Sequence, residues 1–176
     1  MRFRALSISG AYVIESESQR DGRGTFTRTF CASEFGSRGI DTRVAQTSLS
    51  SSPRAGTLRG MHYSAASSCE AKLVRCVHGR AYDVLLDMRR SEATFGHWCA
   101  EDVSRDNARA IFIPAGVAHG FLTLEDETDI LYQMSAPYDP VAARGVRYDD
   151  PAFGILWPSD PAVISERDRA YPSFVG

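Results

Sequence analysis

Two ionisable side chains in the middle of the chain could carry out proton transfer. His62 lies in the strand-like run Leu58–Tyr63, and Lys72 opens another apolar run ten residues later. Because side chains alternate across a strand, Lys72 shares a face with Val74 and Cys76. Buried lysines are rare unless they are paired or functional. An imidazole and an ammonium on apolar faces therefore predict proton chemistry in a cavity.

Two further groups could join them from later in the chain. In the run Asp129–Ala136, Tyr132 shares a face with Ile130 and Met134, so its hydroxyl needs a polar partner. The turn at residues 114–118 directs His119 toward the start of the next strand. The sequence thus predicts an imidazole, an ammonium and a phenol around one internal space.

Taken singly, each group also has a purely structural explanation. His62 could be a hydrogen-bonded core histidine, Arg59 a salt bridge on a sheet face, and Asp168 part of a solvated helix face in Ser165–Arg169. Strict alternation also places Arg59 and His62 on opposite faces of their strand. A bulge at Gly60, or a site at the mouth of the strand, would reconcile them.

A metal site is the first alternative. The segment Pro114–His119 resembles the later half of the metal-binding cupin pattern, which would suit a metal-dependent oxygenase or isomerase. The earlier half is missing, because Ser64 follows His62 where a second histidine is needed and Lys72 stands where a glutamate ligand would fall. A permanent cation repels a divalent metal. We therefore expect no metal.

Without a metal, these groups have the chemistry of a cofactor-independent epimerase. An ammonium can hold an enolate oxygen, an imidazole can remove a proton beside the carbonyl, and a phenol can return a proton to the other face. The sequence contains no GxGxxG or Walker-type phosphate loop, and we expect no cofactor.

Composition indicates an ordinary globular chain of 176 residues with net charge −2, which we expect to form one domain over residues 1–176. The charge gives no reason to expect nucleic acid or membrane as a partner. The N-terminus lacks a signal-peptide pattern, no run is long enough to cross a membrane, and the cysteines show no zinc-like spacing. A cytoplasmic protein with Cys76 as a reduced core thiol is expected.

Short β-branched or alternating runs separated by turn residues predict an all-β fold, a cupin-like double-stranded jelly roll with short peripheral helices. The predicted strands are Ala11–Ile14, Gly24–Phe30, Val44–Ser48, Leu58–Tyr63, Lys72–Val77, Ala81–Met88, Phe95–Val103, Ala110–Pro114, Gly120–Leu124 and Asp129–Ala136. Helices are expected only at Ala32–Arg38 and Ser165–Tyr171.

Motifs in order along almost the whole chain resemble those of the dTDP-4-dehydrorhamnose 3,5-epimerases. They are Asp21-x-Arg23-Gly24-x-Phe26, Leu58-Arg59-Gly60-Met61-His62-Tyr63, Lys72-Leu73-Val74-Arg75, Asp83-Val84-x-x-Asp87-Met88-Arg89, Ile113-Pro114-x-Gly116-x-Ala118-His119-Gly120-Phe121, Asp149-Asp150-Pro151-x-x-Gly154-Ile155-x-Trp157-Pro158 and Ser165-x-x-Asp168. The resemblance implies epimerisation at C3 and C5 of a nucleotide-linked 4-keto-6-deoxyhexose, in a homodimer whose N-terminal strand crosses to the partner.

By this resemblance each site residue has an expected role. His62 is the general base, held by Asp168, while Tyr132 is the general acid and Lys72 stabilises the enolate. The remaining expected substrate contacts are Arg59 and Arg23 on the diphosphate, His119 in the sugar pocket, Tyr138 stacking on the base, and Phe26, Gln46 and Ser48 in the binding set.

Several positions depart from the family pattern. Arg28 and Ala143 stand where glutamates are usual, Ser48 replaces an asparagine, Tyr148 replaces a tryptophan, and Ala66-Ser67 replace paired prolines. In the family these positions lie mostly around the nucleotide, so the resemblance implies that the departures concern the base and the sugar more than the reaction. A single-centre epimerase, an epimerase for another nucleotide sugar and a non-catalytic sugar-nucleotide-binding jelly roll remain alternatives.

Overall fold

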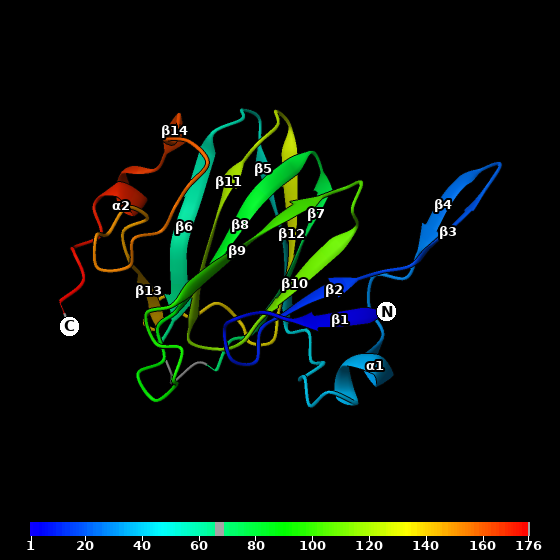
Figure 1. Cartoon of the computed structure of the whole chain (residues 1–176), viewed down its shortest axis with the longest axis horizontal. Coiled ribbons are helices and arrows are strands. Elements are labelled where there is room, and N and C mark those ends of the chain that lie inside the picture. The colour runs from blue at the N-terminus through cyan, green and yellow to red at the C-terminus, as the bar shows by residue number, and fades with distance from the viewer. Residues whose placement is uncertain (66–68, 176) are drawn as a thin grey trace.

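The computed structural model describes residues 1–65 and 69–175, so the altered positions Ala66 and Ser67 lie outside the described residues. Two six-stranded sheets face each other as a β-sandwich. Figure 1 shows the sandwich with a two-stranded hairpin projecting from one side and a short helix at each flank. The expected all-β architecture with short peripheral helices is confirmed.

The first sheet has the order β1-β2-β10-β7-β12-β5. Its strands are β1 Arg2–Ala5, β2 Tyr12–Glu15, β10 Arg109–Ile113, β7 Lys72–His78, β12 Thr128–Met134 and β5 Gln46–Ser52. The second sheet has the order β13-β6-β11-β8-β9, with β14 pairing parallel to β6. Its strands are β13 Ala143–Gly145, β6 Thr57–Ser64, β11 Val117–Thr123, β8 Arg80–Asp87, β9 Trp98–Ser104 and β14 Val163–Ile164.

The remaining elements lie outside the two sheets. Strands β3 Ser18–Asp21 and β4 Gly24–Thr27 form the projecting hairpin, helix α1 is Ala32–Gly36 and helix α2 is Glu166–Arg169. Phe35 anchors α1 in an apolar cluster on the outer face of the first sheet. No helix in the described part of the chain is long and apolar enough to span a membrane.

The inner faces of the strands change from apolar core to polar cavity along their length. On β7, Val74 and Cys76 pack in the central core, while Lys72 on the same face lines a cavity. On β12, Ile130 is fully buried in the core and Tyr132 faces the cavity. The alternation predicted for both strands is therefore confirmed. Burial raises the pKa of the Cys76 thiol to about 11, in keeping with its expected role as a core residue.

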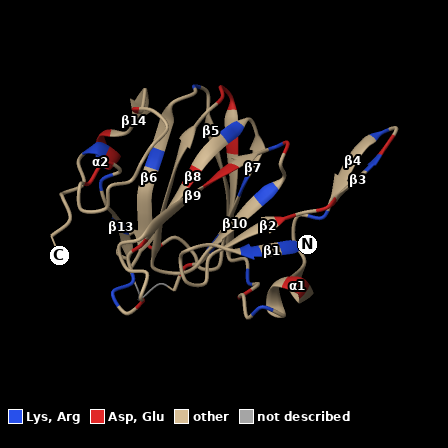
Figure 2. Cartoon of the chain, in the orientation of Figure 1, with Lys and Arg blue, Asp and Glu red and all other residues tan. Residues whose placement is uncertain are grey.

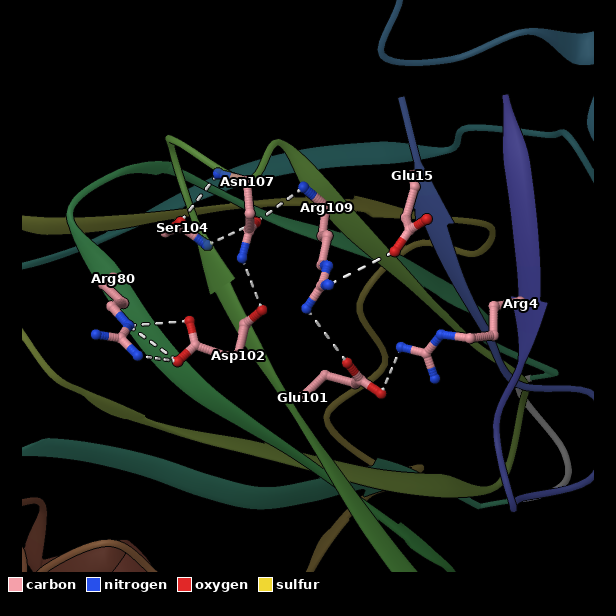
Figure 3. A network of polar contacts seen from close by, with 8 residues as sticks. All are labelled: Arg4, Glu15, Arg80, Glu101, Asp102, Ser104, Asn107 and Arg109. Carbon is pink, nitrogen blue, oxygen red and sulfur yellow. Dashed lines mark hydrogen bonds and ion pairs between the residues drawn. The ribbon is translucent and has the colours of Figure 1, made fainter. Parts of the chain in front are cut away.

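Ion pairs join the two sheets at the edge formed by β1, β2 and β9 (Figure 3). Glu101 of β9 accepts a hydrogen bond from Arg4 of β1 at 2.8 Å and lies 3.7 Å from the guanidinium of Arg109. Arg109 in turn pairs with Glu15 of β2 at 3.5 Å. This edge is closed by charged side chains, whereas the cavity lies toward the opposite edge, between β5 and β6.

Each predicted strand overlaps an observed one, and both predicted helices are present in shortened form. The prediction missed β1, β3, β13 and β14. Strand β3 is exposed along its whole length, so no apolar alternation marks it. Strand β14 has only two residues, too few for any periodic pattern. Strand β11 also begins earlier than expected, so His119 lies inside a strand instead of before it.

Candidate active site

A cavity of about 640 Å³ lies between the two sheets. Strands β5, β7 and β12 of the first sheet form one wall, and β6, β11, β13 and helix α2 form the other. Most of the site residues predicted from the sequence line this cavity. They are Gln46, Ser48, Arg59, His62, Lys72, His119, Tyr132, Tyr138 and Asp168.

A bulge in β6 places Arg59 and His62 on the same face of the strand. Phe121 of β11 pairs with Arg59 and His119 pairs with His62, so two residues of β6 oppose Gly120 alone. Residues directly opposite in an antiparallel pair share a face, and both partners on β11 point inward. The bulge expected at Gly60 is confirmed, and it resolves the conflict with strict alternation.

His62 and Asp168 form a close pair on one wall of the cavity. His62 Nε2 lies 2.7 Å from Asp168 Oδ1, and the Gly60 backbone N–H donates to Asp168 Oδ2 at 3.2 Å. Asp168 is 4% exposed, so it does not belong to a solvated helix face. Its own backbone N–H donates to Ser165 Oγ at 3.1 Å, which fixes the first turn of α2.

The pKa of Asp168 lies below its usual value. Burial alone would raise this pKa, but the hydrogen bonds from His62 and Gly60 and the charge of His62 outweigh burial. Asp168 is therefore an ionised acceptor that fixes the orientation of the imidazole. Such a pair has the parts of a general base, with the imidazole facing the cavity.

Lys72 does not stand alone in the cavity. Its Nζ lies 3.2 Å from Glu70 Oε1, and both side chains are largely buried. The sequence reasoning missed Glu70, although a residue two positions before Lys72 shares its face in an extended segment. The ion pair explains how an ammonium can remain charged in this enclosed position.

Tyr132 lies across the cavity from His62, because β12 and β6 belong to opposite sheets. Its ring meets the His119 ring edge-on, with centroids 5.8 Å apart. The pKa of Tyr132 is raised, mainly by burial and also by the charge of Asp83, while Arg59 opposes the shift. The phenol is therefore protonated and has a proton to donate.

The outer end of the cavity combines hydrogen-bonding groups with aromatic and basic side chains. Gln46 donates to Ser48 Oγ at 3.3 Å and accepts from the Tyr138 backbone N–H at 3.1 Å. Arg144 and Arg167 also line the cavity, and neither had been singled out from the sequence. Arg167 was hidden in the charged segment of α2, a pattern typical of solvated helices.

The structure places the described altered positions in three regions. Ser48 and Ala143 line the cavity. Arg28 lies outside it, close to the projecting hairpin, and pairs with Glu34 at 3.4 Å. Tyr148 packs edge-on against Trp157 and is not among the cavity residues.

Arg23 and Phe26 do not reach the cavity of their own chain. Both lie on the β3–β4 hairpin, which extends away from the sandwich on the side opposite α2 (Figure 1). Arg23 pairs with its neighbour Asp21 at 2.6 Å, and Phe26 is 76% exposed. A contact of either residue with a substrate would therefore have to be made in the cavity of a partner chain, and it stays a prediction.

The described residues contain no group of three or more histidine, cysteine or acidic side chains placed to hold a metal ion. Basic and acidic residues are interspersed over the strands and loops (Figure 2). The cavity itself holds cationic groups at several points, including Arg59 and Lys72, which suit an anionic ligand.

Comparison with known proteins decides the family. The family model for dTDP-4-dehydrorhamnose 3,5-epimerase matches residues 5–175. The chain belongs to the dTDP-4-dehydrorhamnose 3,5-epimerase family. It is 41% identical to the dTDP-4-dehydrorhamnose 3,5-epimerase of Methanothermobacter thermautotrophicus, over 96% of this chain and 91% of that protein.

Two further relatives of this epimerase-family chain bear on its reaction. The dTDP-4-dehydrorhamnose 3-epimerase of Streptomyces niveus is 38% identical, over 96% of this chain and 82% of that protein. The crystal structure of NovW, a 4-keto-6-deoxy sugar epimerase from Streptomyces spheroides, superposes with a TM-score of 0.94. NovW is 34% identical, over 98% of this chain and 87% of its own. The cupin-like jelly roll predicted from the sequence is confirmed.

Proposed function

We propose that this protein inverts C3 and C5 of a nucleotide-linked 4-keto-6-deoxyhexose through an enolate, without a redox cofactor. The substrate we assign is dTDP-linked, as the names of its relatives indicate. The ketone at C4 acidifies the C–H bonds on both neighbouring carbons, so acid and base groups are sufficient for the chemistry.

One observation carries this proposal: the base and the acid stand on opposite walls of one cavity. The His62–Asp168 pair lies on the wall formed by β6 and α2, and Tyr132 lies on the facing sheet. Inversion requires a proton to leave one face of a carbon and another to arrive on the opposite face. A sugar ring held between these walls presents one face to each group.

In this proposal His62 removes the proton, the electron pair of the C–H bond forms the enolate, and Lys72 stabilises the enolate oxygen. Tyr132 then gives its O–H proton to the same carbon from the other face, which restores the C4 carbonyl. His119 lines the sugar pocket, and Arg59 binds the diphosphate. Gln46, Ser48 and Tyr138 would contact the nucleotide at the outer end of the cavity.

We further propose a homodimer in which the β3–β4 hairpin enters the partner's cavity. Strand β1 pairs with β2 of its own chain, so the hairpin is the N-terminal element free to be exchanged. It carries the exposed Phe26 and the exposed guanidinium of Arg23. An exposed aromatic ring and a guanidinium of this kind are suited to contact the base and the diphosphate of a nucleotide bound in the partner's cavity.

A cytoplasmic setting is also proposed. It is supported by Cys31, Cys76 and Cys99, which are free thiols, and by the nucleotide-linked substrate class.

Proton NMR of dTDP-4-keto-6-deoxyglucose in D₂O with the purified protein tests the reaction. We expect deuterium at both C3 and C5 and conversion to the inverted sugar. In His62→Ala, exchange at both carbons should be abolished; retained exchange would contradict the assignment of the base. Exchange at C3 alone would instead support the single-centre reaction named for the Streptomyces niveus relative. Binding without exchange would indicate a non-catalytic sugar-nucleotide-binding protein.

Replacing the thymine nucleotide tests the altered positions around the base. The same NMR experiment with the UDP-, CDP- and GDP-linked ketosugars measures kcat/KM for each. We expect the dTDP-linked sugar to have the highest value. A higher value with another base would reassign the nucleotide and leave the roles of His62 and Tyr132 unchanged.

A further inference from the structure

A second histidine–carboxylate pair borders the same cavity, and its carboxylate has no role in the mechanism above. His119 of β11 places Nε2 at 2.8 Å from Asp83 Oδ2 of β8. Asp83 is 0% exposed and His119 is 4% exposed. His119 is also directly opposite His62 in the register of β11 and β6. Two such pairs therefore stand side by side on one sheet.

Asp83 is buried with one of its two carboxylate oxygens unpaired. Its Oδ1 atom is buried and receives no hydrogen bond from the described part of the chain. Leaving a buried charged acceptor without a donor lowers the stability of the folded state. Asp87, on the same face of β8, is equally buried but accepts from Arg89 and Thr94. A buried charge left partly unsatisfied next to an active site suggests a functional reason.

Of these two residues, His119 contacts the ring of Tyr132. The two rings meet edge-on at an interplanar angle of 71°. The pKa of Tyr132 is raised mainly by burial and also by the charge of Asp83, while the charge of Arg59 on β6 lowers it. The walls also carry the ion pairs of His62 with Asp168 and of Lys72 with Glu70, and the guanidinium groups of Arg144 and Arg167.

We propose that Asp83 is a positioning residue for proton donation by Tyr132, acting through His119. Asp83 fixes the His119 ring, and the edge of that ring fixes the phenol against the carbon that receives the proton. After each inversion Tyr132 recovers its proton from solvent, and His62 releases to solvent the proton it removed. This inference rests on the proposed epimerase function. It concerns only the second step of each inversion, in which the carbon is reprotonated.

The test compares inversion with exchange in Asp83→Asn, using the same ketosugar in D₂O. His62 can return a deuteron to the face it deprotonated, which gives exchange without inversion. A Tyr132 phenol that is no longer held at the carbon transfers its proton to that carbon less often. The kcat for inversion should therefore fall by at least about 10-fold. KM should change by less than about 2-fold, because substrate contacts remain. The ratio of exchange to inversion should rise.

Asp87→Asn is the matched control, because it removes an equally buried carboxylate from the same strand. It should lower stability through the lost Arg89 contact and leave the ratio of exchange to inversion unchanged. If Asp83→Asn lowers exchange and inversion in equal proportion, as a general loss of folded protein would, the inference is overturned.

Two more variants make the result independent of folding. In a Tyr132→Phe background, Asp83→Asn should lower kcat for inversion by less than about a further 2-fold. The effects of residues that act as one unit are not additive. A full further loss in that background would contradict the inference. If Asp83→Asn does not fold, His119→Gln removes the same contact from the other partner and should raise the same ratio; an unchanged ratio would overturn it. A wild-type protein that neither exchanges nor inverts the sugar would overturn the proposed function itself.

Discussion

Asp168 links the chemistry of the base to the stability of the fold. Its pKa in the folded chain lies below the value of an ordinary aspartate, so the folded state binds this proton more weakly than the unfolded state. The resulting stability is complete above the unfolded pKa, near pH 4, and is lost as the pH falls through the folded value.

Replacing Asp168 by asparagine should therefore have a pH-dependent effect. We expect Asp168→Asn to lower the free energy of unfolding by about 2 kcal/mol at pH 7, because a buried charge-assisted hydrogen bond is lost. The difference from wild type should shrink below about pH 4. Urea unfolding at pH 7 and at pH 3 measures both values. Asp160→Asn, an exposed carboxylate in the same segment, is the control and should change stability by less than about 0.5 kcal/mol. A difference independent of pH would contradict this account.

Single residues differ in how far the sequence predicts them. Alternation correctly placed Lys72 with Val74 and Cys76, because all three lie on one regular strand. Asp168 was not predictable in this way, since its burial depends on His62, which lies 106 positions away in the chain. Its role came only from the resemblance to a family. Arg144 was missed because neither pattern nor motif marks it, and Glu70 was missed because it precedes the predicted strand, although alternation places it on the face of Lys72.

At the scale of the element, the β6 bulge depends on close backbone contact with β11. A Cβ atom on Gly60 would lie 2.5 Å from Gly120 Cα, and the φ of Gly60 is +137°. We expect Gly60→Ala to lower the free energy of unfolding by more than about 2 kcal/mol, as the added methyl must push the two strands apart. Epimerase activity should fall as well, because the same shift moves Arg59 and His62.

Gly24→Ala separates the steric effect from the backbone effect. Gly24 has a similar φ of +128°, but a Cβ added there meets no atom within 4 Å. This variant should lose only about 1 kcal/mol. Thermal and urea unfolding of the two variants give the comparison. Equal losses would show that backbone strain, and not the contact with Gly120, determines the cost at Gly60.

Elements with apolar alternation were predicted well, and those without it were not. The predicted strands of the sandwich bury one face or, as in β11, both faces, so their apolar and β-branched residues identify them. Strand β3 buries no residue, and β14 is held by its pairing with Thr57 and Leu58 of β6. Their positions are set by tertiary contacts, which a local pattern does not record.

At the scale of the whole molecule, the hairpin proposal predicts that two defective subunits can repair each other. His62→Ala removes the base, and Arg23→Ala removes the guanidinium that the hairpin would place in the partner's cavity. In a mixed dimer, the His62→Ala subunit supplies an intact hairpin to the intact base of the other subunit. Random exchange at equal amounts should therefore restore roughly a quarter of wild-type activity.

Kinetics at low substrate concentration, before and after mixing, measure this recovery. The single variants incubated alone are the controls. A hairpin that acts within its own chain would leave every site with one defect, so mixing would give no recovery. A monomeric mass for the wild-type protein in sedimentation would also contradict the proposal.

The carboxylate that completes the base comes from the C-terminal segment, although the imidazole it holds is in the first half of the chain. During synthesis on the ribosome, the strands that build the cavity emerge before α2 does. Until α2 has emerged, the imidazole of His62 has no carboxylate partner. On the proposed mechanism, proton abstraction becomes possible only after α2 has docked against β6, so the order of synthesis delays activity until the sheets are in place.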